Sequence, residues 1–109
     1  ITYASRNNEI ASIMRKQSHP VRTSRRRFTV RNTNRLLAGS LMVSAGKTGY
    51  IDASGYCLAA VVKIDDRDPI AVVVLGASSN RRRFSEVLRL ANWVSQNRDS
   101  LISEPVRFN

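Results

Sequence analysis

Apolar residues are concentrated in the second half of the chain, where they form two nearly uninterrupted runs. One run covers 56–64 and the other 70–75, and both are rich in aliphatic residues. Runs of this length, bounded by turn-forming residues at 52–55 and 65–69, are typical of buried strands. Together with the segment that ends near Tyr50, they predict a three-stranded antiparallel meander, and we expect its second strand to be covered on both faces.

Two further segments have apolar residues at the three- and four-residue spacing of a helix face. The shorter segment, 8–16, predicts an amphipathic helix that ends before the first proline. The longer one predicts a helix of about four turns against the sheet, capped by 78–80, with the stripe Phe84, Val87, Leu88, Ala91 and Val94. We expect Trp93 to join the core, and residues 96–109 to be irregular, with Pro105 breaking any continuation.

The formal net charge of +10, from 18 Lys and Arg against 8 Asp and Glu, is the unusual feature of the composition. Such a charge favours contact with nucleic acid, anionic lipid or an acidic polymer, and does not choose among them. Five arginines gather in 22–31, which we interpret as a solvated loop leading into a short strand. We expect Phe28 and Val30, which alternate in that strand, to be buried. Since single-stranded nucleic acids stack on exposed rings, this run argues against a nucleic-acid site.

Cysteine and histidine are too scarce for a disulfide or a metal centre. Cys57 and His19 are each the only residue of their type, so we expect no metal and no other cofactor. The 109 residues suit one domain or part of one. No apolar run approaches the roughly 20 residues of a membrane span, and the chain starts at Ile1 without a secretion signal, which suggests a piece of a longer protein.

A Lys-Thr-Gly triplet at 47–49 is the stretch with the clearest chemical meaning. This triplet is one of three signature motifs of penicillin-binding proteins and serine β-lactamases. It is accompanied by Ser-Gly-Tyr-Cys-Leu at 54–58, Asn-Thr-Asn-Arg-Leu-Leu at 32–37, the apolar run at 70–77 and Arg-Phe at 83–84. In this order and spacing the blocks resemble the C-terminal part of the D-alanyl-D-alanine carboxypeptidases, the low-molecular-mass penicillin-binding proteins of the serine β-lactamase-like superfamily.

The resemblance implies an α/β fold in which an antiparallel sheet is covered by helices. Residues 1–109 would be the C-terminal portion of one transpeptidase-like domain and would supply three strands of its sheet. In the family the strand at 70–75 pairs with a strand from the N-terminal part, so this chain alone would leave an apolar edge unpaired. Because such edges recruit another chain, we expect the missing N-terminal segment, a companion chain, or otherwise self-association.

The resemblance also assigns roles along the triplet. Lys47 would hold the substrate's C-terminal carboxylate, an attraction of about 4 kcal/mol at ~4 Å and an effective dielectric constant of about 20, before desolvation. Thr48 would donate its hydroxyl to the same carboxylate, and Gly49 would leave room for the substrate backbone. The backbone N–H of Tyr50 would be one of two oxyanion-hole donors. The implied ligands are a peptidoglycan stem peptide ending in D-Ala-D-Ala, and β-lactams.

The family's serine nucleophile has no counterpart in the chain. Ser12 and Lys16 are one position too far apart for the Ser-x-x-Lys motif, which rotates the lysine off the serine on a helix. Ser24 has the right spacing to Arg27, but an arginine cannot act as a base. The Ser-x-Asn sequence at 78–80 follows the triplet instead of preceding it and suits a helix cap. We therefore expect the part that carries the nucleophile to be missing and this chain alone to be inactive.

Two functions are compatible with these residues. The first is a fragment of a serine-type D-Ala-D-Ala carboxypeptidase, a cell-wall hydrolase working through an acyl-enzyme, to which the chain supplies the substrate-binding and oxyanion strand. The alternative is a non-catalytic module of the same fold that binds an anionic polymer, with the cell wall favoured over nucleic acid. The resemblance implies a periplasmic or other extracytoplasmic location.

Overall fold

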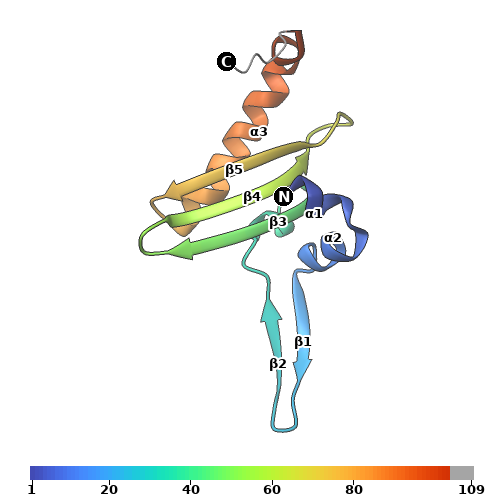
Figure 1. Cartoon of the computed structure of the whole chain (residues 1–109), viewed down its shortest axis with the longest axis vertical. Coiled ribbons are helices and arrows are strands. Elements are labelled where there is room, and N and C mark those ends of the chain that lie inside the picture. The colour runs from blue at the N-terminus through green and yellow to red at the C-terminus, as the bar shows by residue number, and fades with distance from the viewer. Residues whose placement is uncertain (104–109) are drawn as a thin grey trace.

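A three-stranded antiparallel sheet forms the centre of the molecule in the computed structural model, which describes residues 1–103 (Figure 1). Its strands are β3 (Met42–Ile51), β4 (Gly55–Lys63) and β5 (Ile70–Ala77), in the order β3-β4-β5. The meander expected from the apolar runs is therefore confirmed. β4 is the central strand and β3 and β5 are the edges.

The register of the sheet determines which side chains share a face. Thr48 of β3 lies opposite Leu58 of β4, which lies opposite Val74 of β5. Directly opposed residues in an antiparallel sheet point to the same face, and successive residues alternate. Lys47 and Val73, which both lie opposite Ala59, therefore belong to the other face.

Helix α3 (Asn80–Ser103) packs against β4 and β5 on the face that contains Leu58 (Figure 1). The side-chain oxygen of Ser79 accepts a hydrogen bond from the backbone N–H of Arg82, as expected of a cap in 78–80. The core between helix and sheet contains Leu36, Val43, Leu58, Ala60, Val62, Val72, Val74, Phe84, Val87 and Ala91. The predicted apolar stripe thus contributes three of these buried residues.

The helix continues well beyond its predicted end. Residues 96–103, which we expected to be irregular, are helical, because contacts with the β4–β5 loop stabilise them. The Arg98 guanidinium donates to the Asp68 carbonyl oxygen at 2.9 Å, and Arg67 forms an ion pair with Asp99. Trp93, expected in the core, is 50% exposed because it lies beside the buried stripe and not within it. The expectation for 104–109, including Pro105, lies outside the described residues.

Two short helices precede the sheet. Helices α1 (Thr2–Arg6) and α2 (Asn8–Met14) both contact β3, and Ala11 is their buried residue. The Asn7 side chain accepts a hydrogen bond from the backbone N–H of Ile10 and so caps the N-terminus of α2. No helix in the described part of the chain has both the length and the apolar composition of a membrane span.

The arginine-rich segment belongs to a β-hairpin: the short strand that we expected at its end is confirmed as β2, whereas Arg22, expected in a loop, ends a second strand. Strand β1 (Ser18–Arg22) pairs with β2 (Arg27–Arg31), and Figure 1 shows the hairpin projecting away from the central sheet. Phe28 and Val30, expected to be buried, are 38% and 50% exposed, because the hairpin forms its own two-stranded sheet. A short 3-10 helix, η1 (Arg35–Ala38), then leads into β3.

Candidate functional site

Lys47 lies on an edge strand, exposed, on the sheet face opposite α3. Its Nζ donates to the neighbouring Thr48 carbonyl oxygen at 2.5 Å, and it has no ion pair with a carboxylate among the residues described. Within residues 1–103, β3 has a neighbouring strand on one side, so its other edge has no strand partner. An exposed ammonium beside a free strand edge suits a ligand that carries a carboxylate and an extended backbone.

Thr48 is buried on the face that α3 covers. Its hydroxyl oxygen is 2.5 Å from that of Thr33, in the segment that precedes η1. The structure therefore brings the 32–37 block against the triplet, and it directs the side chains of Lys47 and Thr48 to opposite faces of β3.

Asparagine side chains hold this segment in place. The Asn32 amide nitrogen donates to the carbonyl oxygens of Met14 and Lys16, and the Asn34 side-chain oxygen accepts from the backbone N–H of Leu36. A Cβ on Gly46 would clash with the Asn34 amide nitrogen, so the close approach of the two segments depends on that glycine. The sequence shows the Asn-Thr-Asn motif but not that its side chains hold this segment in place. The available signal was the pair of asparagines directly before the Arg-Leu-Leu residues of η1.

Gly49 is exposed and uncrowded. A Cβ there would come no nearer than 4.0 Å, to the Cβ of Cys57, and Gly49 is not among the glycines with a positive φ. Nothing in the described part of the chain requires a glycine at this position.

Arg83 is a site residue that sequence reasoning missed as such. It is only 6% exposed, and its guanidinium donates to the carbonyl oxygens of Gly49 at 3.3 Å and Cys57 at 3.5 Å. The guanidinium carbon also lies 5.4 Å from the Tyr56 ring centroid and 5.1 Å from that of Phe84. Arg83 thus links α3 to the ends of β3 and β4 that carry the triplet. The sequence signal that could have indicated this role was the position of the arginine directly before Phe84, the first residue of the apolar stripe.

Tyr50 is the last residue but one of β3 and pairs with Tyr56 of β4. The two rings lie 4.4 Å apart between centroids, and the Tyr50 hydroxyl donates to the Asp52 carboxylate at 2.7 Å. This hydrogen bond, with smaller contributions from desolvation and from Tyr56, raises the pKa of Tyr50 above its usual value of 10.0.

Ser12, considered as a nucleophile, has a local structural role: its hydroxyl donates to the Glu9 carbonyl oxygen within α2. In the Ser-x-Asn sequence at 78–80, the middle residue, Ser79, caps α3. No group of three His, Cys, Asp or Glu side chains within residues 1–103 is arranged to hold a metal ion. The arrangement offers an exposed ammonium on an edge strand of the sheet.

Known proteins with similar sequences and structures agree with this picture. A family model described as D-alanyl-D-alanine carboxypeptidase matches residues 1–79. The chain belongs to this carboxypeptidase family. A D-alanyl-D-alanine endopeptidase from Escherichia coli is 34% identical over 65 residues, which are 59% of this chain and 21% of that protein.

Two solved structures of the carboxypeptidase family's fold superimpose on the chain. A penicillin-binding protein from Listeria monocytogenes in its cefotaxime-bound form matches with a TM-score of 0.67 at 24% identity, over 84% of this chain and 35% of that one. A D-alanyl-D-alanine carboxypeptidase from Mycobacterium tuberculosis matches with a TM-score of 0.62 at 16% identity, over 82% and 36%. The expected α/β fold is therefore confirmed, and the chain spans about a third of each of these structures.

Proposed function

We propose that this chain is the substrate-binding part of a serine-type D-Ala-D-Ala carboxypeptidase acting on peptidoglycan stem peptides. The observation that carries the proposal is the exposed Lys47 on a strand edge, two residues before a glycine that its own surroundings do not require. The protein has room for a side chain at position 49, yet the residue there is glycine. A glycine at this position lets the backbone of a ligand lie against the strand.

In this proposal the chain supplies recognition and polarisation, and a serine from outside it supplies bond breaking. Lys47 attracts the terminal carboxylate of the peptide, and the N–H of Tyr50 donates to the carbonyl oxygen as it becomes negative. The serine oxygen bonds to that carbonyl carbon, the terminal D-alanine leaves with a proton on its amine, and water then releases the acyl group. β-Lactams would acylate the same serine.

Thr48 has a more restricted role in this scheme than Lys47. Its hydroxyl is hydrogen-bonded to that of Thr33 on the buried face. Thr48 must therefore give up this hydrogen bond before it can donate to the carboxylate of the substrate. By resemblance to the family, the intact protein would act in the periplasm or another extracytoplasmic space.

The test has two arms, because recognition and chemistry are proposed to be separable. In the first, a peptide ending in D-Ala-D-Ala is titrated into the isotope-labelled 109-residue chain, and amide shifts are expected at Lys47, Gly49 and Tyr50. Lys47→Ala should weaken this binding about tenfold or more, through loss of a charge-assisted hydrogen bond. Lys63→Ala, on β4, is the matched control and should leave binding unchanged.

In the second arm, a fluorescent penicillin is applied to the chain alone and to the full coding sequence. The chain alone should stay unlabelled, and a product that includes an upstream Ser-x-x-Lys should be labelled. Labelling of the chain alone would contradict the proposal. No labelling of the full product, combined with salt-sensitive binding to a cell-wall polymer, would instead support the non-catalytic module.

A further inference from the structure

The hairpin β1–β2 has two chemically different faces. Val21 lies opposite Phe28, and His19 lies opposite Val30, so these four side chains share one face of the ribbon. The alternate positions, which form the other face, are more polar and include Arg22, Arg27 and Arg31. Since β1 and β2 pair only with each other in the described part of the chain, no sheet covers the apolar face.

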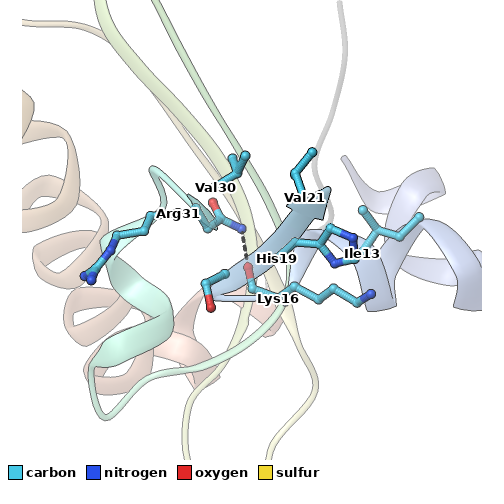
Figure 2. A pocket seen from close by; sticks show the side chains of 8 residues that line it. Ile13, Lys16, His19, Val21, Val30 and Arg31 are labelled. Carbon is cyan, nitrogen blue, oxygen red and sulfur yellow. Dashed lines mark hydrogen bonds between the residues drawn. The ribbon is translucent and has the colours of Figure 1, made fainter. Parts of the chain in front are cut away.

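A hollow of about 500 Å³ continues the apolar face toward α2. It is lined by Ile13, Lys16, Ser18, His19, Val21, Val30, Arg31 and Asn32. Figure 2 shows Val21 and Val30 pointing to one side, with Ile13 beyond His19, and Arg31 directed away from them. The Asn32 amide donates to the Lys16 carbonyl oxygen and so ties the base of the hairpin to the end of α2. Ile13, 60% exposed, extends the uncovered apolar surface beyond the hairpin.

The charged residues of the hairpin and of the lining of the hollow have a single sign. Between Glu9 and Asp52 the sequence contains nine Lys and Arg residues and no Asp or Glu. Four of the nine, Arg22, Arg25, Arg26 and Arg27, lie at the tip of the hairpin.

The tip is an ordered turn. The backbone N–H of Thr23 donates to the Arg26 carbonyl oxygen at 2.9 Å, and the Thr23 hydroxyl accepts from the N–H groups of Arg25 and Arg26. The Arg26 guanidinium lies 4.9 Å from the centroid of the Phe28 ring. These contacts place cationic and apolar side chains together at the most exposed end of the hairpin.

A two-stranded hairpin is marginally stable in water without a third strand or a helix against it. A soluble polyanion would bind the arginines and leave the exposed Phe28, Val30 and Ile13 without a role. Nucleic acid would need exposed aromatic rings for its bases, and Phe28, the one Phe, Tyr or Trp of the hairpin, is already covered by Arg26. An anionic bilayer uses both features, because arginines bind its phosphates while apolar side chains enter the layer between headgroups and acyl chains.

We propose that the hairpin Ser18–Arg31 docks on the surface of an anionic phospholipid bilayer. The tip arginines bind lipid phosphates, and Phe28 and Val30 insert beside them together with Ile13 at the base. This proposal does not depend on the catalytic function, since it uses a surface on which none of the triplet residues lies.

The test measures flotation of the 109-residue chain with vesicles. Vesicles of equal parts phosphatidylcholine and phosphatidylglycerol should bind the chain, and vesicles of phosphatidylcholine alone should not. Each arginine at an anionic surface is worth about a fivefold change in partitioning, so Arg25→Gln with Arg26→Gln should weaken binding about 30-fold. Phe28→Ser with Val30→Ser should weaken it on the order of tenfold.

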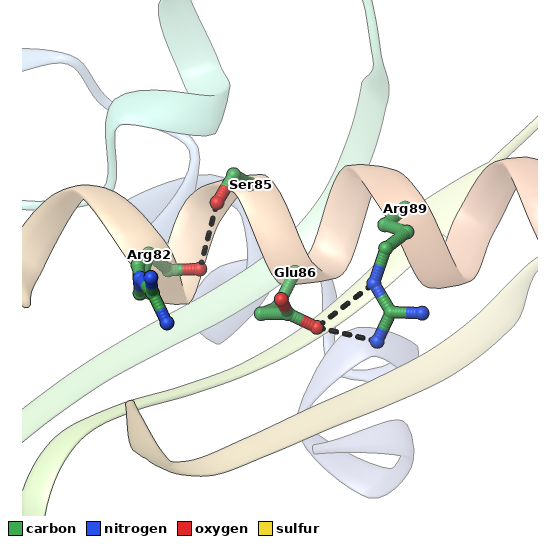
Figure 3. Close-up of polar contacts among 4 residues, drawn as sticks. All are labelled: Arg82, Ser85, Glu86 and Arg89. Carbon is green, nitrogen blue, oxygen red and sulfur yellow. Dashed lines mark hydrogen bonds and ion pairs between the residues drawn. The ribbon is translucent and has the colours of Figure 1, made fainter. Parts of the chain in front are cut away.

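The matched control removes the same charge elsewhere. Arg81 and Arg82 are exposed at the start of α3, so Arg81→Gln with Arg82→Gln should change binding less than threefold if docking is through the hairpin. Arg89 is not used, because its guanidinium is bound to Glu86 at 2.6 Å (Figure 3). Far-ultraviolet circular dichroism of each variant verifies that the central sheet and α3 remain folded.

Three results would overturn the proposal. Equal losses in the hairpin and α3 charge variants would show attraction by net charge alone. Unchanged vesicle binding of Phe28→Ser with Val30→Ser, accompanied by salt-sensitive retention on heparin, would show a soluble polyanion as the partner. A change in oligomeric state with this apolar variant, without a change in vesicle binding, would show that a second copy covers the face.

Discussion

Gly46 and Gly49 lie three residues apart on β3, and the protein around them requires only the first. A side chain at Gly46 would enter the space of the buried Asn34 amide, whereas one at Gly49 would meet the Cβ of Cys57 at an ordinary contact distance of 4.0 Å. The fold therefore requires a glycine at position 46, whereas the proposed requirement for a glycine at position 49 comes from the ligand.

Alanine at each glycine should have opposite effects on stability and binding. Gly46→Ala should lower the free energy of unfolding by about 1–3 kcal/mol, because Asn34 must move and with it the turn at Leu36. Gly49→Ala should stay within about 0.5 kcal/mol of the parent in urea unfolding, and should lose most of its affinity for a D-Ala-D-Ala peptide. Equal destabilisation by both would mean that Gly49 has a structural role in this chain.

The titration of Tyr50 reports on its hydrogen bond to Asp52, in the turn that follows the triplet strand. Its pKa is raised, so the hydrogen bond to Asp52 is present below the ordinary tyrosine pKa of about 10 and is lost as the pH rises through the higher folded value. Asp52→Asn should lower the pKa of Tyr50, followed by carbon NMR of its ring. Asp66→Asn, in the β4–β5 turn, is the control and should leave the titration of Tyr50 unchanged. A Tyr50 titration insensitive to Asp52→Asn would refute the assigned hydrogen bond.

At the scale of elements, the junction between α3 and the β3–β4 hairpin depends on one buried arginine. Arg83 donates to carbonyl oxygens on both strands. Loss of the guanidinium would leave those two oxygens without this donor in a buried setting.

Arg83→Met keeps a long side chain and removes the donors. It should lower the free energy of unfolding by about 1–3 kcal/mol in urea, and it should broaden or shift the amide signals of Gly49 and Cys57. Arg82→Met, at an exposed position of the same helix, should change stability by less than about 0.5 kcal/mol. If the two variants are equally stable, Arg83 does not hold the strands together.

The central strands and the apolar stripe of α3 were predictable because each element buries a face that its own sequence encodes. The first strand of the hairpin, β1, was not predictable, because its residues are largely exposed and no Asn-Gly turn joins Arg22 to its partner Arg27. The final turns of α3 were missed for a related reason. They are stabilised by Arg98 and Asp99, whose partners in the β4–β5 loop are 30 or more residues away.

The candidate site was predictable only in part. The triplet and its strand were readable from local sequence, and the exposed position of Lys47 agrees with the role expected of it. The contact of Thr48 with Thr33 and the reach of Arg83 to Gly49 arise from packing between segments. Such contacts between distant segments have no local signature in a single sequence.

At the scale of the whole molecule, one face of the sheet is covered and much of the other is bare. α3 covers the face that contains Leu58. On the edge strand β5, Leu75 is 77% exposed and Val73 is about half exposed. Monomeric proteins protect such edges with charges or a covering segment.

We therefore expect the isolated chain to associate through β5. Sedimentation should show species larger than a monomer that grow with protein concentration, and Leu75→Lys should shift the population toward the monomer. Leu101→Lys on α3, which also replaces an exposed leucine, should not. A parent chain that stays monomeric at high concentration would contradict this expectation.

The connectivity of the meander also determines the order in which the molecule can be assembled. β3, β4, β5 and α3 each pack against the element next to them in sequence, so their contacts close short loops and form quickly. Ribosomes add about 5–20 residues per second, which is slow compared with such local folding. The sheet that carries Lys47 can thus form as soon as α3 has been synthesised.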